Sequence, residues 1–368
     1  MSDARLPRVA FVAASLDILG GQGVQAQTLL QALRRDGYDV TFTPVNPRFP
    51  PGLRWVRTVP YLRTALNQSL YVPSLLRLAS ADVVHVFSAS FWAFLLGPAP
   101  AMVAAKALGK RLVLHYHSGE AEEHLSRWGS RVHPWLRLAD LIVVPSEFLA
   151  GIFARHGYRT RVIRNVVDLS MFEFRDRDSL GLRLLSTRNL EAHYQVDVVI
   201  DAFARVKAQR PDATLTVAGY GSDEARLRRL AGEGVQFVGR VEQERMPGLC
   251  AGADLFLNAS VVDNQPVSIL EAFAAGVPVV STPTGGIAEM VRDGETGVVV
   301  PPRDPAALAT AALALLDDPA RARAMAAQAR REVDRYTWSA VREEWAAVYA
   351  GDAATSVESH AVPRAVRP

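Results

Sequence analysis

The stretch "DNQPVSILEAFAAGVPVV", residues 263–280, joins a helix start, two carboxylates and a buried strand. Pro266 favours the first turn of a helix, and small residues continue the helix to a glycine–valine–proline stop before the apolar run. Asp263 lies just before the helix and Glu271 about one turn inside it. An acid at a helix N-terminus gains only about 0.3–1 kcal/mol, which explains one carboxylate as a cap but two less readily. A helix start flanked by two acids would instead suit a sugar that carries a phosphate.

Short apolar runs alternate with helical patterns on both sides of this stretch. In the first half these runs are "RVAFVAAS", "DVTFTPV", "ADVVHVFS", "KRLVLHYH", "ADLIVVPS" and "TRVIRNVVD". In the second half they are "LRLLSTRN", "ATLTVAGYG", "VQFVGRV", "DLFLNAS", "PVVSTP" and "TGVVVPP". Continuous Val/Ile/Leu strands separated by helices predict parallel sheets covered on both faces.

The alternation breaks once, at the polar stretch "MFEFRDRDSLG", which divides the chain in two. We expect a Rossmann-like N-terminal domain at 1–172, a linker at 173–181 and a Rossmann-like C-terminal domain at 182–335. A helix at 336–350 should pack back toward the N-terminal domain, and 351–368 should be a disordered tail. Open α/β sheets bind ligands beyond the carboxyl ends of their strands, so two facing sheets would share one site in the cleft between them.

Composition excludes several classes of protein. The 368-residue chain has a formal net charge of only +3, so it is not a nucleic-acid polycation and we expect no nucleic-acid partner. Its single cysteine, Cys250, rules out a disulfide within the chain and a cysteine-based metal site, which suits the cytoplasm. No apolar run reaches the roughly 18 residues of a spanning helix, and the apolar stretch at the N-terminus is too short for a signal peptide.

Positive charge is concentrated in the first half. From Arg48 to Arg77 there are five arginines and no acid, interspersed with Phe49, Trp55, Tyr61 and Tyr71. A basic, aromatic stretch can meet anionic lipid or an anionic acceptor, so 48–77 is a candidate for peripheral contact with the inner face of the plasma membrane. The alternative is a solvated arginine-rich face.

Glycines after the first strand form a second candidate anion site. Gly20 and Gly21 precede a helix, where backbone N–H groups are free to meet a phosphate. The dinucleotide pattern G-x-G-x-x-G is absent, so a simple turn explains these glycines equally well on their own.

Here the sequence carries a family resemblance. "DNQPVSILEAFAAGVPVVSTPTGGIAEMV" is similar to the signature of retaining family-four glycosyltransferases of the GT-B fold: an acid, seven residues, Glu, then Ala, small residues, Gly, x, Pro, Val and a later Gly–Gly. "GGQGVQAQTLLQALRRDGYDV", "LVLHYHSG", "ADLIVVPSEF", "VIRNVVDLSMF", "LRLLSTRN", "VQFVGRV" and "ADLFLNAS" resemble other family segments, in the family's order. The resemblance implies an α/β GT-B architecture, two Rossmann-like doubly wound domains facing across a cleft, with the acceptor on the first and the nucleotide sugar on the second.

The function that this resemblance implies is transfer of a hexose-type sugar from a nucleotide-diphosphate sugar to a hydroxyl acceptor, in bacterial polysaccharide or glycoconjugate biosynthesis. Anomeric configuration would be retained by front-side attack, in which the leaving phosphate takes the acceptor proton. The family needs no cofactor and no essential metal. Donor nucleobase, acceptor and oligomeric state are not encoded in these motifs.

The resemblance also assigns roles to residues. The catalytic group is His117 at the donor–acceptor junction, Asp263 on the donor sugar and Arg188 on the diphosphate. Glu271 corresponds to the glutamate that contacts the ribose. The donor-binding residues are Gly20, Gly21, Arg188, His193, Val238, Gly239, Arg240, Asp263, Val267, Ser268, Ile269 and Glu271; among them the N–H groups of 267–269 should be unpaired and point into the cleft.

Two positions depart from the family pattern. Asp263 stands where the family usually has Glu, and the lysine that normally follows Arg188 is replaced by His193 and Tyr194. Stabilisation of the leaving diphosphate would then rest on Arg188, the helix N-termini and His193. These departures motivate an alternative, a non-catalytic GT-B protein that binds a nucleotide sugar or a partner.

Two further histidines and one acid pair have to be weighed as candidates for the site. We expect His115 to be structural and to point to the opposite face of its strand from His117, and His85 to face the acceptor. The acid pair of "DRD" at 176–178 resembles the metal-binding pair of another glycosyltransferase fold, but it lies in the expected linker and is better explained as a solvated charge run.

Overall fold

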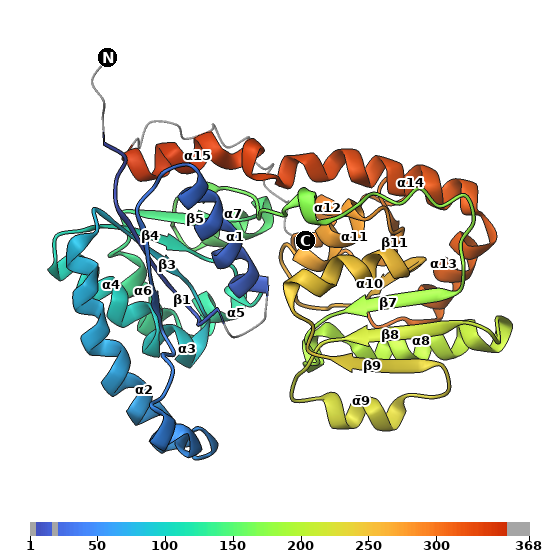
Figure 1. Ribbon diagram of the computed structural model, residues 1–368, viewed down its shortest axis with the longest axis horizontal. Helices are drawn as coiled ribbons and strands as arrows, with labels where there is room; N and C mark the ends of the chain where they lie inside the picture. The colour runs from blue at the N-terminus through green and yellow to red at the C-terminus, as the bar shows by residue number, and fades with distance from the viewer. Residues whose placement is uncertain (1–4, 17–20, 352–368) are drawn as a thin grey trace, which may run out of the picture.

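The computed structural model describes residues 5–16 and 21–351, and two parallel six-stranded sheets organise it (Figure 1). The first sheet has the order β2-β1-β3-β4-β5-β6. Its strands are β1 (Val9–Ala13), β2 (Val40–Pro44), β3 (Val83–Phe87), β4 (Arg111–His115), β5 (Leu141–Val144) and β6 (Arg161–Val162). Every pairing in it is parallel, as the continuous apolar runs predict.

The second sheet has the order β12-β11-β10-β7-β8-β9. Its strands are β7 (Arg183–Thr187), β8 (Thr214–Ala218), β9 (Val235–Gly239), β10 (Leu255–Asn258), β11 (Val279–Ser281) and β12 (Val298–Val299). All its pairings are parallel too. Read from β7, this is the strand order of a doubly wound dinucleotide-binding sheet.

Helices cover both faces of each sheet because the strands are apolar on both sides. Those of the first half are α1 (Gly21–Arg35), α2 (Pro60–Ser74), α3 (Phe91–Leu96), α4 (Pro98–Ala107), α5 (Ala121–Arg127), α6 (Gly129–Leu136) and α7 (Glu147–Arg155). Those of the second half are α8 (Val196–Gln209), α9 (Glu224–Leu230), α10 (Met246–Gly252), α11 (Val267–Ala274), α12 (Ile287–Met290), α13 (Pro305–Asp317), α14 (Pro319–Glu332) and α15 (Trp338–Ala350).

Short 3-10 segments complete the chain: η1 (Pro51–Thr58), η2 (Leu75–Ser80), η3 (Leu169–Met171), η4 (Ala192–Tyr194), η5 (Gln243–Arg245) and η6 (Val333–Tyr336). Among the helices of the described residues, none has both the length and the apolar character needed to cross a bilayer.

The last helix returns to the first sheet. α14 lies along the second half, and α15 crosses back over the first (Figure 1). Trp345, Val348 and Tyr349 of α15 are buried in one core cluster with Val9 and Phe11 of β1. This contact ties the two lobes together through the end of the chain. The tail predicted to be disordered, 351–368, lies outside the described residues except for Gly351.

Each sheet has a point where the chain reverses its direction of strand addition. In the first sheet this point lies between β1 and β3, and in the second between β7 and β10. A crevice forms there because the following helices go to opposite faces, and ligands of open α/β sheets bind in it. The two reversal points therefore predict where a shared site should lie.

Candidate functional site

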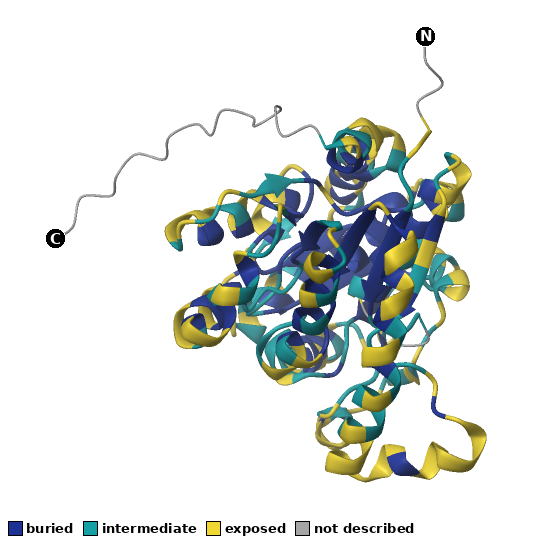
Figure 2. Ribbon diagram, turned by 90° about the vertical axis from the view of Figure 1, so that its left-hand side faces the viewer, coloured by how far each residue is buried: buried dark blue, intermediate teal, exposed yellow. Residues whose placement is uncertain are grey.

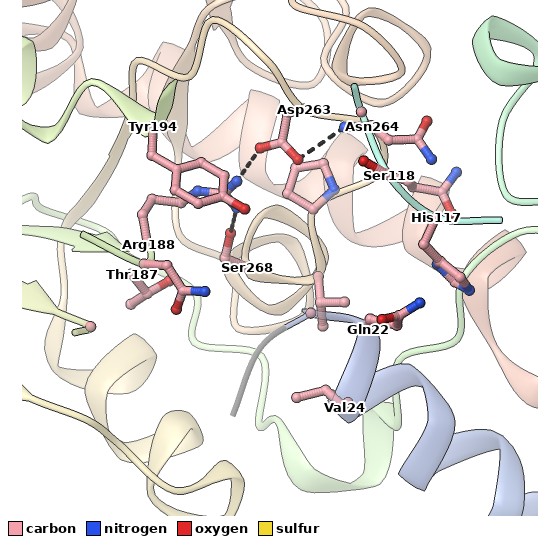
Figure 3. A pocket seen from close by; sticks show the side chains of 18 of the residues that line it. Gln22, Val24, His117, Ser118, Thr187, Arg188, Tyr194, Asp263, Asn264 and Ser268 are labelled. Atoms are coloured by element: carbon pink, nitrogen blue, oxygen red, sulfur yellow. Dashed lines mark hydrogen bonds and ion pairs between the residues drawn. The ribbon is translucent and has the colours of Figure 1, made fainter. Parts of the chain in front are cut away.

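A cleft of about 600 Å³ lies between the two lobes, within the range of small-molecule sites. The loops that line it follow the carboxyl ends of the strands at both reversal points: Gly21–Val24 after β1, Ser88–Phe91 after β3, Thr187–Asn189 at β7 and Val262–Ser268 after β10 (Figure 3). His117–Glu120 after β4 and Ala218–Tyr220 at β8 complete the walls. Residues 263–268, at the start of the stretch "DNQPVSILEAFAAGVPVV", therefore form the floor of the cleft.

The first turn of α11 faces this cleft. Pro266 is the residue before the helix, and no side chain caps it. The N–H groups of Val267 and Ser268 have no partner among the described residues, and both residues line the cleft. Free N–H groups at a helix start form an anion site. The prediction was wrong for Ile269, whose N–H donates to the Pro266 carbonyl (3.2 Å) and whose side chain lies in the core, because the first turn closes tightly.

Glu271 lies one turn further along α11 and also lines the cleft. It is buried, so it does not sit on a solvated helix face. Gln243 Nε2 donates to its Oε1 at 2.7 Å. Burial raises the pKa of Glu271 to about 7, and the bond from Gln243 opposes this only in part. A carboxylate held at such a site accepts hydroxyl hydrogen bonds in place of water.

Arg188 and Asp263 face each other across the cleft floor. Their side chains form an ion pair, and both are nearly buried. The guanidinium also donates to Ser268 Oγ (3.0 Å) and lies 4.2 Å above the centre of the Tyr194 ring. Three contacts on one guanidinium fix its direction, as Figure 3 shows. Tyr194 thus stacks where the family pattern has a lysine nearby, and it holds the arginine rather than adding charge.

Asp263 does not cap α11. Its Oδ1 accepts from the N–H of Asn264 (2.9 Å), and its other oxygen meets Arg188. The loop that carries it rests on the Gly285–Gly286 pair. A Cβ on Gly285, which has φ +58°, would overlap the Asp263 carbonyl oxygen, and one on Gly286 would overlap the Asn264 backbone. Glycine is therefore needed at 285 and 286 because their loop packs directly against the backbone of Asp263 and Asn264.

The same reasoning explains "GYG" after β8. A Cβ on Gly219, which has φ +151°, would overlap the Arg188 carbonyl, and one on Gly221 would overlap Leu190. The N–H of Arg188 donates to the Ala218 carbonyl (3.0 Å). These contacts fix the position of the Arg188 backbone at the cleft.

The other wall comes from the first lobe. His117 and Ser118 line the cleft, and Gly119 approaches so closely that an added Cβ would lie 3.0 Å from the Asp263 carbonyl carbon. Burial lowers the pKa of His117 to about 3, so its imidazole is neutral at physiological pH. Its Nε2 is buried with no hydrogen-bond partner in the described part of the chain. Gln22 of α1 donates to the Ser88 carbonyl and joins the two loops at the first reversal point.

Motif residues also hold the lobes together. Gln265 accepts from the N–H of Asn165 (2.6 Å) and donates to the Pro145 carbonyl (2.9 Å), both in the first lobe. Glu289 accepts from the N–H of Phe148 (2.7 Å) at the start of α7. The relative position of the two cleft walls is thus fixed by the second-half signature itself.

Two expectations about histidines were wrong. His115 and His117 lie on the same side of their strand, with ring centres 4.0 Å apart, because residues two apart share a face. His85 does not face the cleft; it is buried beneath α15, where its Nδ1 and the Tyr349 hydroxyl share a hydrogen bond of 2.8 Å. Both histidines are part of the packing that connects α15 to the first sheet.

Nine of the residues predicted for the site line the cleft: Gly21, His117, Arg188, His193, Arg240, Asp263, Val267, Ser268 and Glu271. Besides Ile269, Val238 and Gly239 do not, because β9 ends before the cleft and Val238 faces solvent. Gly20 lies outside the described residues. The acid pair Asp176 and Asp178 lies away from the cleft and binds Arg323.

The cleft residues that were not predicted include Gln22, Tyr194, Gln243 and Asn264. Asn264 directly follows Asp263 and Gln22 directly follows Gly21, so both could have been predicted as neighbours of assigned site residues. Tyr194 and Gln243 lie on short 3-10 turns whose position depends on tertiary packing. In residues 5–16 and 21–351, no group of three or more His, Cys, Asp or Glu side chains is arranged to hold a metal ion.

Comparison with known proteins agrees with this geometry. Residues 19–171 match the family described as Glycosyltransferase Family 4, and residues 182–318 match Glycosyl transferases group 1. The chain is 33% identical over 289 residues to a glycogen synthase of Mycobacterium tuberculosis, covering 73% of this chain and 68% of that protein. It is 38% identical over 158 residues to a GDP-mannose-dependent monoacylated alpha-(1-6)-phosphatidylinositol monomannoside mannosyltransferase of Corynebacterium glutamicum, covering 40% and 41%.

Solved structures share the whole fold. Anabaena Alr3699/HepE, in complex with UDP-glucose, superposes with a TM-score of 0.74 at 18% identity, covering 94% of this chain and 100% of that one. Sucrose-phosphate synthase from Thermosynechococcus elongatus gives a TM-score of 0.72 at 20% identity, covering 94% and 99%. The two facing sheets are therefore a GT-B fold.

Proposed function

The chain belongs to glycosyltransferase family 4, whose members use nucleotide-sugar donors, and we propose that it transfers a hexose to a hydroxyl acceptor with retention of configuration and without a metal. The observation that carries this proposal is on α11. Two free N–H groups at its first turn and the buried carboxylate of Glu271 one turn later line one cleft together with Arg188. A nucleoside diphosphate needs this pair of groups, an anion site next to an acceptor of ribose hydroxyl bonds.

We assign the chemistry as follows. Cleavage of the sugar–diphosphate bond places charge on the diphosphate, and preorganised donors stabilise that charge. The amides of Val267 and Ser268 and the guanidinium of Arg188 are such donors. Tyr194 and Ser268 hold the guanidinium in place, so little reorganisation is needed when the charge develops.

Asp263 has two roles in this proposal. It orients Arg188 through their ion pair, and it faces the donor sugar. When a diphosphate takes over the guanidinium, the carboxylate is released to accept bonds from sugar hydroxyls. This exchange keeps the Arg188 guanidinium paired with an anion at every stage, and hydrogen bonds from the sugar hydroxyls then compensate the released Asp263 carboxylate.

His117 lies across from these groups on the acceptor side. Because its pKa is about 3, it is a neutral hydrogen-bonding group rather than a general acid. We assign it to orient the sugar or the acceptor hydroxyl. Proton removal from the acceptor then falls to the leaving phosphate oxygen, in a front-side attack.

Donor choice is open to direct test. UDP-glucose and GDP-mannose are the first candidates, because one occurs with the structural relative HepE and the other in the name of a sequence relative. Nucleotide release is measured for these and an ADP-sugar with saccharide, lipid-linked and small hydroxyl acceptors, with and without EDTA. The product's anomeric configuration is read by NMR.

The expected result is acceptor-dependent release that EDTA leaves unchanged and that Glu271→Ala abolishes. Glu244→Ala is the matched control, because Glu244 is an exposed carboxylate outside the cleft. Donor binding without turnover across the whole acceptor panel would favour the non-catalytic alternative. An inverted product would refute front-side attack.

A further inference from the structure

A largely exposed arm projects from the first lobe. Residues 51–80 form η1, α2 and η2, which extend away from both sheets (Figure 1) and are the mostly yellow projection at the lower right of Figure 2. Few of its side chains are buried: Val56, Tyr71, Leu75 and Leu78. Tyr71, Leu75 and Leu78 pack the base of the arm into the core of the first lobe, but most of the arm covers neither sheet, so its exposed composition is not explained by the fold.

Large apolar side chains are concentrated on this arm. Tyr61 is 92% exposed, Leu76 74% and Trp55 59%. Of the fourteen large hydrophobic residues that are exposed in the described chain, seven lie here: Leu53, Trp55, Val59, Tyr61, Leu62, Val72 and Leu76. Soluble proteins rarely expose so much apolar surface in one segment unless it meets a partner.

The arm also carries positive charge without compensation. No Asp or Glu occurs between Asp39 and Asp82. Arg54, Arg63 and Arg77 have no acidic partner among the described residues, whereas Arg8, directly before β1, pairs with Asp82. Unpaired arginines beside exposed Trp and Tyr match the chemistry of a membrane–water interface, where phosphates meet the guanidinium groups and aromatic rings sit at headgroup level.

The arm is connected to the mouth of the cleft. Gln68 of α2 donates to the Leu96 carbonyl (3.0 Å) and buried Tyr71 donates to the Gly97 carbonyl (2.7 Å), both at the end of α3. At its other end α3 begins with Phe91, which lines the cleft, and its exposed Trp92 extends the apolar surface.

We propose that residues 51–80 dock this protein on an anionic lipid bilayer. Trp55, Tyr61 and Leu76 enter the headgroup region, and Arg54, Arg63 and Arg77 bind lipid phosphates. Docking would hold the acceptor side of the cleft at the bilayer. Docking at the bilayer would favour a lipid-linked acceptor, and this consequence rests on the proposed function. The docking proposal does not depend on that function.

Vesicle sedimentation of the full chain tests the proposal. Vesicles of phosphatidylcholine with 30 mol% phosphatidylglycerol are compared with pure phosphatidylcholine, at 0.1 M and 1 M salt. We expect binding to the anionic vesicles only at the lower salt, because the screening length falls from about 10 Å to about 3 Å. A basic residue near an anionic surface strengthens binding about five-fold, so the triple variant R54Q/R63Q/R77Q should bind about 100-fold more weakly.

The matched control is R159Q/R229Q/R303Q. It removes the same charge from three exposed arginines that also lack an acidic partner in the described chain but lie outside the arm. This control should bind like the unmodified chain, and W55S/Y61S should bind more weakly. Equal losses in the two triple variants, equal binding to neutral vesicles or no binding at all would each overturn the proposal. None of these readouts needs donor or turnover, so they are independent of transferase activity.

Discussion

Replacing Glu271 by glutamine tests two effects of the buried carboxylate separately: its cost to the stability of the fold and its contribution to nucleotide binding. The carboxylate is buried where α11 lines the cleft, and burial raises its pKa from 4.5 to about 7. Glutamine has nearly the same shape and keeps an oxygen that accepts from Gln243. The substitution therefore removes charge with little change in packing.

The sign and size of the effect follow from the two pKa values. Below pH 4.5 the carboxyl group is protonated in both folded and unfolded chains, so it causes no penalty. Between pH 4.5 and 7 the unfolded chain ionises while the folded chain stays protonated, and the stability of the fold declines as pH rises. Each pKa unit corresponds to about 1.4 kcal/mol, so the penalty is about 1 kcal/mol at pH 5 and about 3 kcal/mol at pH 8. Glu271→Gln should therefore raise the free energy of unfolding by about 2–3 kcal/mol more at pH 8 than at pH 5.

Denaturant unfolding at the two pH values measures this gain, with the exposed Glu244→Gln as the control that should show no such difference. Nucleotide affinity should change in the opposite direction. Hydrogen bonds to a charged group contribute about 1.5–3 kcal/mol, so Glu271→Gln should weaken nucleotide diphosphate binding at pH 8 at least ten-fold. Equal stabilisation at pH 5 and pH 8, or unchanged nucleotide affinity, would refute the assignment of Glu271 as a buried carboxylate kept for the ribose.

Three further substitutions test the site. Arg188→Ala should lower kcat about 100- to 1000-fold in a nucleotide-release assay, because it removes a preorganised donor. Arg188→Lys should restore little of this activity, since an ammonium cannot stack on Tyr194 and form hydrogen bonds in two directions at once. A loss of less than ten-fold in Arg188→Ala would argue against a role of Arg188 in stabilising the diphosphate. Gly285→Ala should unfold at least 1 kcal/mol more readily than Gly294→Ala, because both have positive φ but only the first would meet backbone, and it should also weaken nucleotide binding; similar melting of the two variants would contradict the close approach. His117→Ala should lower kcat without changing the shape of the pH–rate profile between pH 5 and 9, because the ring is already neutral there; an inflection near pH 6.5 that the variant lacks would show that the ring does titrate.

Much of the fold was predictable because its signal is local. Parallel strands buried on both faces must be continuously apolar, and each apolar run quoted from the sequence contains one of the twelve strands. Alternation with helices then leaves few arrangements. The helix α2 was not predicted, because most of its apolar residues are exposed and follow no core-facing pattern.

The site was predictable where spacing along one element carries it. Val267, Ser268 and Glu271 share α11, so their relation follows from helical geometry. Ile269 was mispredicted since the closure of the first turn depends on the Pro266 carbonyl, and Val238 and Gly239 since the end of β9 depends on the sheet.

Sequence alone therefore determined the two doubly wound sheets and the acid–helix–acid element, because these depend on periodicity and spacing within short segments, whereas the partner loops were implied by the family resemblance. Only the tertiary structure decided that Arg188 pairs with Asp263 over Tyr194, that Gly285 and Gly219 exist to let loops touch, and that His115 lies against His117. Such contacts join residues far apart in the chain, and their geometry depends on the packing of both lobes at once.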